Sequence, residues 1–213
     1  MEISYLGHAC FRLKGKEVTV ITDPYDKSVG YNLGRPTADI VTVSHDHLDH
    51  NYVPGVGGNP KVVKGPGEYE IKGVTITGIG AFHDEQGGKQ RGKNTIYLIG
   101  IEELVICHLG DLGHRLAQSQ VEAMERIDVL LVPVGGFCTI DAAQAAEMVS
   151  LLEPKIVVPM HFKTEVAKLD IDPVDRFLKE MGLKGAEPQP RLVVNRASLP
   201  EETQVILLDY RRG

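Results

Sequence analysis

The stretch Asp39-Ile40-Val41-Thr42-Val43-Ser44-His45-Asp46-His47-Leu48-Asp49-His50 joins an apolar run to a cluster of histidines and aspartates. Its first half is rich in β-branched residues and predicts a buried strand. Its second half offers imidazole nitrogens and carboxylate oxygens, which are suitable ligands for zinc, iron and manganese. The stretch therefore predicts a strand that runs directly into a metal site.

The spacing of the ligands within this run suggests two neighbouring metal positions. If the backbone stays extended from residue 45 to residue 47, His45 and His47 project to the same side and can reach one ion. Asp49 and His50 lie just beyond and can face a second ion. A solvated polar loop is disfavoured because three of the eight histidines in the chain fall within these six residues. A structural zinc site is also disfavoured, because such sites are usually rich in cysteine and no CxxC pair is present.

Composition places the chain among ordinary folded proteins and limits its partners. It has 213 residues, 42% of them hydrophobic, and a formal net charge of -6. We expect one domain over residues 1–213, because no linker, repeat or low-complexity segment interrupts the chain. The acidic balance and the absence of tryptophan argue against a nucleic-acid or membrane partner. A small-molecule substrate is expected, and an anionic one is allowed because metal ions supply local positive charge. The oligomeric state stays open.

Cysteine usage and the N-terminal residues predict a cytoplasmic protein. The first residues lack the basic and apolar regions of a signal peptide. Cys10, Cys107 and Cys138 are an odd number with no close pair, which is typical of reduced thiols.

Alternating and β-branched segments predict strands in the first hundred residues, and helices join them in the second half. Strands are expected at residues 3–6, 10–13, 18–22, 39–44, 61–63, 74–77, 95–99, 104–107, 128–134, 156–158, 192–194 and 204–207. Helices are expected at residues 118–127, at 142–152 after an Asp141 cap, and from Asp172-Pro173 to Gly182. The polar loop at 84–93 carries Lys89, Arg91 and Lys93, which can recognise a phosphate or carboxylate or can simply be solvated.

Four further residues with metal-binding side chains follow predicted strands. These residues are His83, His108, Asp111 and His161. A lone histidine is more often structural than a ligand, so each is weak evidence alone. Together with the cluster they provide the number of ligands that two ions require.

Short motifs in a fixed order connect these candidates. They are Gly7-His8-Ala9, Thr22-Asp23-Pro24, the HxHxDH run, Gly110-Asp111, Pro133-Val134-Gly135-Gly136 and Pro159-Met160-His161. On these motifs the chain resembles the metallo-β-lactamase fold superfamily, and more narrowly its small metal-dependent hydrolases related to bacterial ascorbate-phosphate lactonase. The resemblance implies an α/β fold, a four-layer αββα sandwich with the metals at one edge.

The resemblance also implies roles for individual residues. His45, His47 and His83 would hold the first ion, Asp49, His50 and His161 the second, and Asp111 would bridge both. His8 and Asp23 match positions close to the site, in a supporting role or on the substrate side. For Asp23 a simple Asp-Pro turn is an equal alternative, and for His8 a satisfied polar group under the sheet edge. His108 is an alternative third ligand of the first ion, or a partner that orients a ligand. Cys138 departs from the family, which often has tyrosine there.

These observations predict a metal-dependent hydrolase of unknown substrate. Two divalent ions are expected, zinc first, with manganese or iron as alternatives. A hydroxide that bridges them would attack a small ester, lactone, amide or phosphoester. Asp49, which can orient the water or accept its proton, and Asp111 are the expected catalytic carboxylates. Two alternatives stay open: a metal-dependent nuclease or phosphodiesterase, and a non-hydrolytic metal-binding or redox protein of the same fold.

Overall fold

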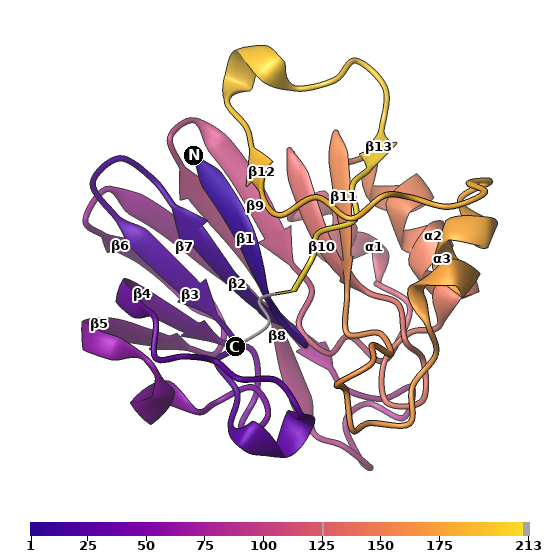
Figure 1. Cartoon of the computed structure of the whole chain (residues 1–213), viewed down its shortest axis with the longest axis horizontal. Coiled ribbons are helices and arrows are strands. Elements are labelled where there is room, and N and C mark those ends of the chain that lie inside the picture. The colour runs from indigo at the N-terminus through magenta and orange to yellow at the C-terminus, as the bar shows by residue number, and fades with distance from the viewer. Residues whose placement is uncertain (125, 211–213) are drawn as a thin grey trace.

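Two mixed β-sheets form the centre of the computed structural model, which describes residues 1–124 and 126–210 (Figure 1). The first sheet has the order β12-β1-β2-β3-β4-β5, and the second has the order β13-β11-β10-β9-β8-β7-β6. The strands of the first sheet are β1 (Glu2–Gly7), β2 (Cys10–Lys14), β3 (Thr19–Thr22), β4 (Thr37–Val43), β5 (Gly57–Lys64) and β12 (Leu192–Val193). Those of the second are β6 (Gly67–Ile71), β7 (Val74–Phe82), β8 (Lys93–Ile101), β9 (Leu104–His108), β10 (Val129–Pro133), β11 (Ile156–Met160) and β13 (Gln204–Val205).

Strand direction brings several loops to one edge of the sandwich. Strands β3, β4 and β5 pair in parallel in the first sheet, and β9, β10 and β11 pair in parallel in the second. The carboxyl ends of neighbouring parallel strands lie at the same edge of a sheet, where open α/β sheets place their functional groups. The strand that opens the histidine cluster is confirmed, as β4.

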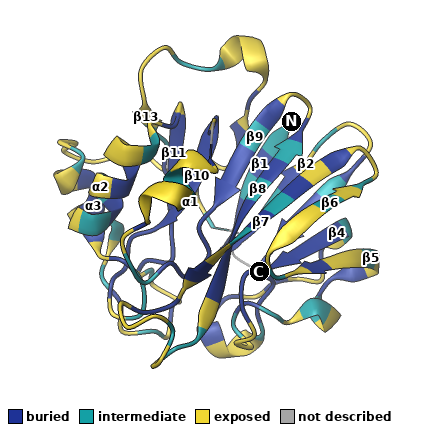
Figure 2. Cartoon of the chain, turned by 180° about the vertical axis from the view of Figure 1, so that it is seen from behind, coloured by how far each residue is buried: buried dark blue, intermediate teal, exposed yellow. Residues whose placement is uncertain are grey.

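The apolar faces of the two sheets pack against each other. Ile3, Phe11 and Ile40 of the first sheet belong to the same buried cluster as Ile76 and Ile99 of the second. Figure 2 shows buried residues in most of the strands, whereas exposed residues are frequent in β5, in β6, in the loops and on the outer sides of the helices. One continuous core therefore spans both sheets.

Three helices lie on the side of the second sheet: α1 (Gln118–Glu122), α2 (Ala142–Leu152) and α3 (Val174–Glu180). The expected helix at 142–152 is confirmed, with the Asp141 carboxylate accepting a hydrogen bond from the Gln144 backbone N–H. Helix α1 begins at Gln118 as expected but ends at Glu122, short of the expected 118–127; residue 125 of that range lies outside the described residues. Helix α3 begins after Pro173 rather than at it. Within the described residues, no helix combines the length and apolar character that a membrane crossing needs.

The outer face of the first sheet is covered by irregular chain instead of α-helices. Two 3₁₀ turns, η1 (Lys27–Val29) and η2 (Val53–Gly55), lie in the covering segments. Tyr25 and Tyr31 pack there against Ile21 of the sheet in a second apolar cluster. The α/β sandwich is confirmed, with one outer layer built from packed loops. Strand β6, an edge strand with exposed Glu68 and Glu70, was not predicted, although Glu68 to Ile71 alternate between polar and apolar residues.

Tyr97 joins the two sheets beside the histidine cluster. Its hydroxyl donates a hydrogen bond to the Val43 carbonyl at 2.8 Å and accepts one from the Gly65 backbone N–H at 2.9 Å. The ring is fully buried in β8, whereas Val43 ends β4 and Gly65 follows β5. The tyrosine thus holds the cluster strand against the second sheet.

We predict that Tyr97→Phe lowers the free energy of unfolding by about 1–3 kcal/mol, because it leaves two buried backbone groups unpaired. Urea unfolding of metal-free protein measures this change. Tyr52→Phe is the control, since Tyr52 is partly exposed and its hydroxyl has no hydrogen bond to a described residue; it should change stability by less than about 0.5 kcal/mol. Equal effects of the two substitutions would contradict the prediction.

Candidate metal centre

The candidate metal-binding side chains lie just beyond the carboxyl ends of strands from both sheets. Each of them follows a different strand: His8 follows β1, Asp23 follows β3, the run from His45 to His50 follows β4, His83 follows β7, Asp111 follows β9 and His161 follows β11. Residues up to 153 positions apart in the chain therefore meet at one edge of the sandwich.

His45, His47 and His83 form one group of potential ligands. One ligand atom from each lies within 4.8 Å of the other two. The ring centroid of His45 is 4.7 Å from that of His47 and 4.7 Å from that of His83. The expected extended backbone at 45–47 is wrong, since residues 44–50 form bends and turns. The imidazoles converge because the turn curls the chain around the site, not because of strand alternation.

His50 and His161 form a second group together with His8. One ring nitrogen from each lies within 4.8 Å of the other two, and all three side chains are buried. The His161 backbone N–H donates to the His8 carbonyl at 2.8 Å, which fixes the two residues beside each other. Both have left-handed backbones, with φ of 57° at His8 and 52° at His161. Such strain in non-glycine residues tends to gather at functional sites.

Asp111 lies between the two groups. Its Oδ2 is 3.3 Å from His50 Nε2, 3.3 Å from His83 Nε2 and 3.4 Å from His161 Nε2. Burial alone would raise the pKa of this carboxyl, but His161 and His50 hold it well below its usual range. A single buried carboxylate oxygen thus contacts ligands of both groups.

Several buried polar atoms of these side chains have no hydrogen-bond partner, and this indicates the kind of ligand that the site can hold. Among the described residues, eight buried side-chain atoms have no hydrogen-bond partner, and six of them belong to this cluster. The six atoms are His8 Nε2, His45 Nε2, His50 Nε2, His83 Nδ1, Asp111 Oδ1 and His161 Nδ1. An unpaired buried polar atom is costly and needs an explanation. Imidazole nitrogens and carboxylate oxygens converging in this way fit divalent cations.

Asp23 supports both groups through a short hydrogen-bond network. It is completely buried and accepts bonds from the backbone N–H and the hydroxyl of Ser44 and from Nδ1 of His50. The Ser44 hydroxyl is also 2.9 Å from Nδ1 of His45. With Nδ1 of both histidines engaged, Nε2 of each is left free to bind a metal. The simple Asp-Pro turn at Asp23 is therefore insufficient as an explanation.

Asp49 and Asp46 are only three positions apart in the chain, but their side chains point to different environments. Asp49 Oδ2 is 3.3 Å from His8 Nε2 and 3.8 Å from His50 Nε2, and 28% of its side chain is exposed. Burial opposes its ionisation, but the nearby His8 ring and then the charge of His50 hold the pKa of Asp49 far below its usual range. Asp46 points outward and pairs with Lys64 at 2.7 Å. Only Asp49 faces the cluster.

His108 lies in the core with both ring nitrogens engaged. Nε2 is 2.8 Å from the Ala9 carbonyl, and Nδ1 accepts a hydrogen bond from the Gly110 backbone N–H at 3.1 Å. The ring is completely buried and belongs to neither ligand group. His108 therefore shapes the turn before Asp111, whereas His83 joins His45 and His47.

Two supporting residues were not found from the sequence. Ser44 was assigned only to the strand, although it carries the network from Asp23. Asn94 is buried, accepts a hydrogen bond from the Asp111 backbone N–H at 3.1 Å and donates one to the Leu109 carbonyl at 2.9 Å. Its position in a strand after a polar loop was the available signal, but amides are common there.

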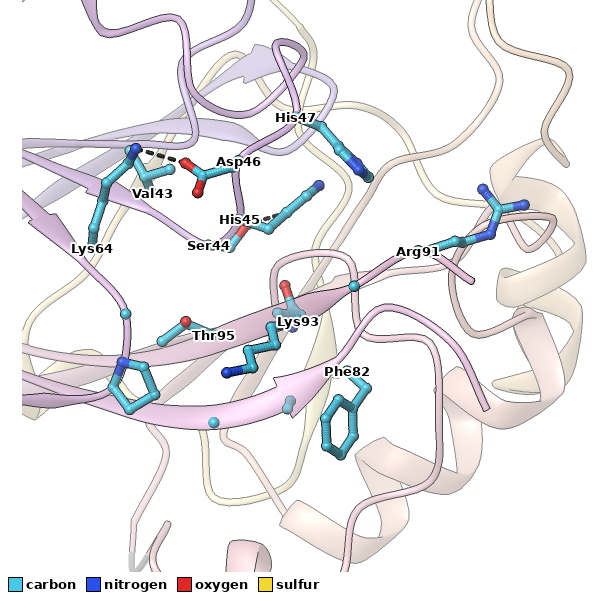
Figure 3. Close-up of a pocket in the computed structure, with 16 residues that line it drawn as sticks. Val43, Ser44, His45, Asp46, His47, Lys64, Phe82, Arg91, Lys93 and Thr95 are labelled. Atoms are coloured by element: carbon cyan, nitrogen blue, oxygen red, sulfur yellow. Dashed lines mark hydrogen bonds and ion pairs between the residues drawn. The ribbon is translucent and has the colours of Figure 1, made fainter. Parts of the chain in front are cut away.

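Two cavities open beside the cluster. The larger, of about 650 Å³, is lined by His45, His47 and residues of β7 and β8, including Phe82 and Lys93 (Figure 3). The smaller, of about 250 Å³, is lined by His83, Arg91 and Cys138 among others. The sulfur of Cys138 is 4.0 Å from His161 Nε2. Burial of the thiol, and to a smaller extent the negative charge of Asp111, raise the pKa of Cys138 to about 12.

Comparisons with known proteins agree with this geometry. A model of the β-lactamase superfamily domain matches residues 2–161. A UPF0173 metal-dependent hydrolase of Hyperthermus butylicus is 30% identical over 85% of this chain and 92% of its own length. A structure from Thermotoga maritima, described as a candidate zinc-dependent hydrolase of the metallo-β-lactamase superfamily, shares 40% identity over 99% of both chains, with a TM-score of 0.82.

A more distant structure, a metallo-hydrolase of Ignicoccus hospitalis, has a TM-score of 0.64 at 21% identity and covers 91% of this chain and 99% of its own. At that identity it supports the fold alone. The family match covers most of the chain and includes the cluster from His8 to His161. The chain belongs to the metallo-β-lactamase superfamily and, within it, to the metal-dependent hydrolases.

Proposed function

We propose that this protein holds two divalent ions, zinc in the first instance, and hydrolyses a small ester, lactone, amide or phosphoester. The ligands of the first ion are His45, His47 and His83. Asp49, His50 and His161 would hold the second, and Asp111 would contribute to both. One observation carries the proposal: Asp111 Oδ2 lies 3.3–3.4 Å from histidine nitrogens of both groups.

The ions would supply Lewis-acid charge and a water that is acidic enough to react near neutral pH. The chain supplies the geometry. Asp23 and Ser44 hold the rings of His50 and His45 with Nε2 directed at the cluster. Asn94 fixes the backbone of Asp111. These contacts restrict the ligands to one arrangement before substrate arrives.

Asp49 is the group proposed to handle the proton. It is the partly exposed carboxylate on the solvent side of the cluster, and it is ionised at neutral pH. Its Oδ2 can orient the attacking water and accept its proton, while His8, 3.3 Å away, holds the carboxylate in place. Neutral His8 suits this role, because burial and the neighbouring His161 lower its pKa to about 4.

The cavities fit the hydrolysis of a small molecule better than the cleavage of a nucleic acid. The cluster opens into cavities of about 650 and 250 Å³, which suit a small molecule. The net charge of -6 argues against a polyanionic substrate. Relatives named as metal-dependent hydrolases support hydrolysis over a redox role.

The ligand set predicts about two ions per chain, because seven ligand side chains exceed what one four-coordinate ion uses. Elemental analysis of protein purified without chelator, repeated after dialysis against zinc or manganese, measures the content. A value that stays at one ion or below after metal addition would contradict the binuclear site.

Asp111→Asn should lower the hydrolysis rate by about a hundredfold or more, because an amide cannot neutralise two cations. Rates on any ester, lactone or phosphoester that the parent accepts give the measurement, and circular dichroism checks the fold. Near wild-type hydrolysis in the variant would remove Asp111 from the site.

Asp23→Asn should weaken zinc binding by about 10- to 100-fold, because the His50 ring loses the carboxylate that orients it. Competition with a chromogenic chelator measures the affinity. Asp46→Asn is the matched control, since Asp46 lies in the run from His45 to His50 but is 83% exposed and pairs with Lys64. The assignment fails if Asp46→Asn weakens binding as much as Asp23→Asn does.

A further inference from the structure

The loop between β7 and β8 is organised by one carboxylate. Asp84 Oδ1 accepts hydrogen bonds from the backbone N–H groups of Gln86 and Gly88, and Oδ2 accepts them from Gln90 and Arg91, at 2.7–3.0 Å. These four bonds lower the pKa of Asp84 to about 2, and the bond from the Arg91 backbone N–H has the largest effect. Burial acts in the opposite direction. The alternative of a flexible solvated loop does not fit such a network.

The same loop is anchored to the metal centre. The His83 backbone N–H donates to the Gly92 carbonyl at 3.0 Å, and the Gly92 N–H donates to the Gly88 carbonyl at 3.0 Å. Asp84 is therefore adjacent in sequence to a proposed ligand and bonded to the backbone of Arg91. The position of the Arg91 backbone relative to the cluster is set by these contacts.

The Arg91 guanidinium is the cation that this loop presents to the site. Arg91 is half-buried, lines both cavities and lies over the Phe137 ring, 5.3 Å from its centroid. Among the described arginines, only Arg35 and Arg91 have no carboxylate within ion-pair distance. An unpaired arginine is unusual in an acidic chain that has carboxylates to spare.

The other two cations of the loop are placed differently. Lys89 is exposed and lines neither cavity. Lys93 lines the larger cavity, but Figure 3 shows its side chain extending in the opposite direction from that of Arg91. The smaller cavity places Arg91 beside His83 and Cys138, which is the side of the cluster that also holds His161.

We propose that Arg91 binds an anionic oxygen group of the substrate, a carboxylate or phosphate, and that Asp84 is the positioning residue that holds Arg91 in place. This inference rests on the hydrolase function proposed above. Arginine suits such a group because its planar guanidinium pairs both oxygens at once. Phe137, 78% exposed with φ of 60°, supports the guanidinium face and leaves its N–H edge free to bind. The substrate is thus a small anion that carries its scissile bond a short distance from the charged group.

Binding of stable anions to zinc-loaded protein tests the proposal without relying on catalysis. Phenylphosphonate and benzoate are the probes, benzamide is their neutral counterpart, and calorimetry gives the dissociation constants. Arg91→Gln should weaken binding of at least one anion by about tenfold, because a charge-assisted hydrogen bond is lost. Arg91→Lys should recover part of it, and Lys89→Gln should change binding less than about twofold.

The two probes separate the possible sources of the anionic group. A loss confined to phenylphosphonate assigns a phosphate, a loss confined to benzoate assigns a carboxylate, and a loss of both assigns a site for either. Asp84→Asn should weaken binding of the same anion that Arg91→Gln affects, and the zinc content should stay unchanged. The Asn side chain of this variant cannot accept four backbone hydrogen bonds, so the loop no longer holds Arg91 in place. The Arg91 Nε–H signal in NMR spectra should then no longer shift when the anion is added.

Three results would overturn the proposal. They are anion affinity unchanged in Arg91→Gln, an equal loss in Lys89→Gln, and no binding of either anion by the wild-type protein at millimolar concentration. Zinc content measured on the same samples keeps a failure of the binuclear centre distinct, because fewer than two ions per chain would be visible before any anion is added. Thermal unfolding of each variant confirms that it is folded.

Discussion

The buried carboxylate of Asp111 is the feature on which the rest of this site depends. Water cannot solvate it, and three imidazoles surround one of its oxygens. A buried charge is tolerated only when it is compensated. The imidazoles compensate incompletely: the pKa of His50 is raised by Asp111 and Asp23 against the effect of burial, whereas burial lowers the pKa of His83 and His161. The proposed metal ions would supply the positive charge that the imidazoles provide only in part.

The surrounding structure meets this requirement at a cost in local stability. His8 and His161 have left-handed backbones, and a Cβ at Gly135 would lie 2.2 Å from the His161 carbonyl oxygen. Strain and close approach of this kind persist only where neighbouring contacts over-determine the geometry. Here the contacts are the His161 to His8 backbone bond and the parallel pairing of β10 with β11. The sandwich therefore serves as a rigid frame for residues that would not adopt these conformations alone.

Features encoded by neighbouring residues were predictable from the sequence, and those created by distant contacts were not. Asp141 and the helix at 142–152 follow local capping and spacing rules, and the candidate ligands His45, His47, Asp49 and His50 lie within six residues of the chain. The hydrogen bonds from Ser44 to Asp23 and from Asp111 to Asn94 join residues 21 and 17 positions apart, which no local pattern reveals. The extended backbone considered at residues 45–47 is absent, because residues 44–50 form bends and turns. His83 and His108 both follow strands, so their different partners become visible only when the sheets pack.

The charge distribution gives the site a physical basis for selecting its substrate. The chain is acidic overall, and most of its described arginines are neutralised by carboxylates. Within the loop, the Asp84 carboxylate accepts four backbone N–H bonds and does not pair with the Arg91 guanidinium. The same carboxylate thus fixes the loop and leaves the guanidinium charge available. An acidic surface that repels polyanions, combined with the Arg91 guanidinium beside the proposed metal centre, favours a small anion that can enter the cavity without extended contact with that surface.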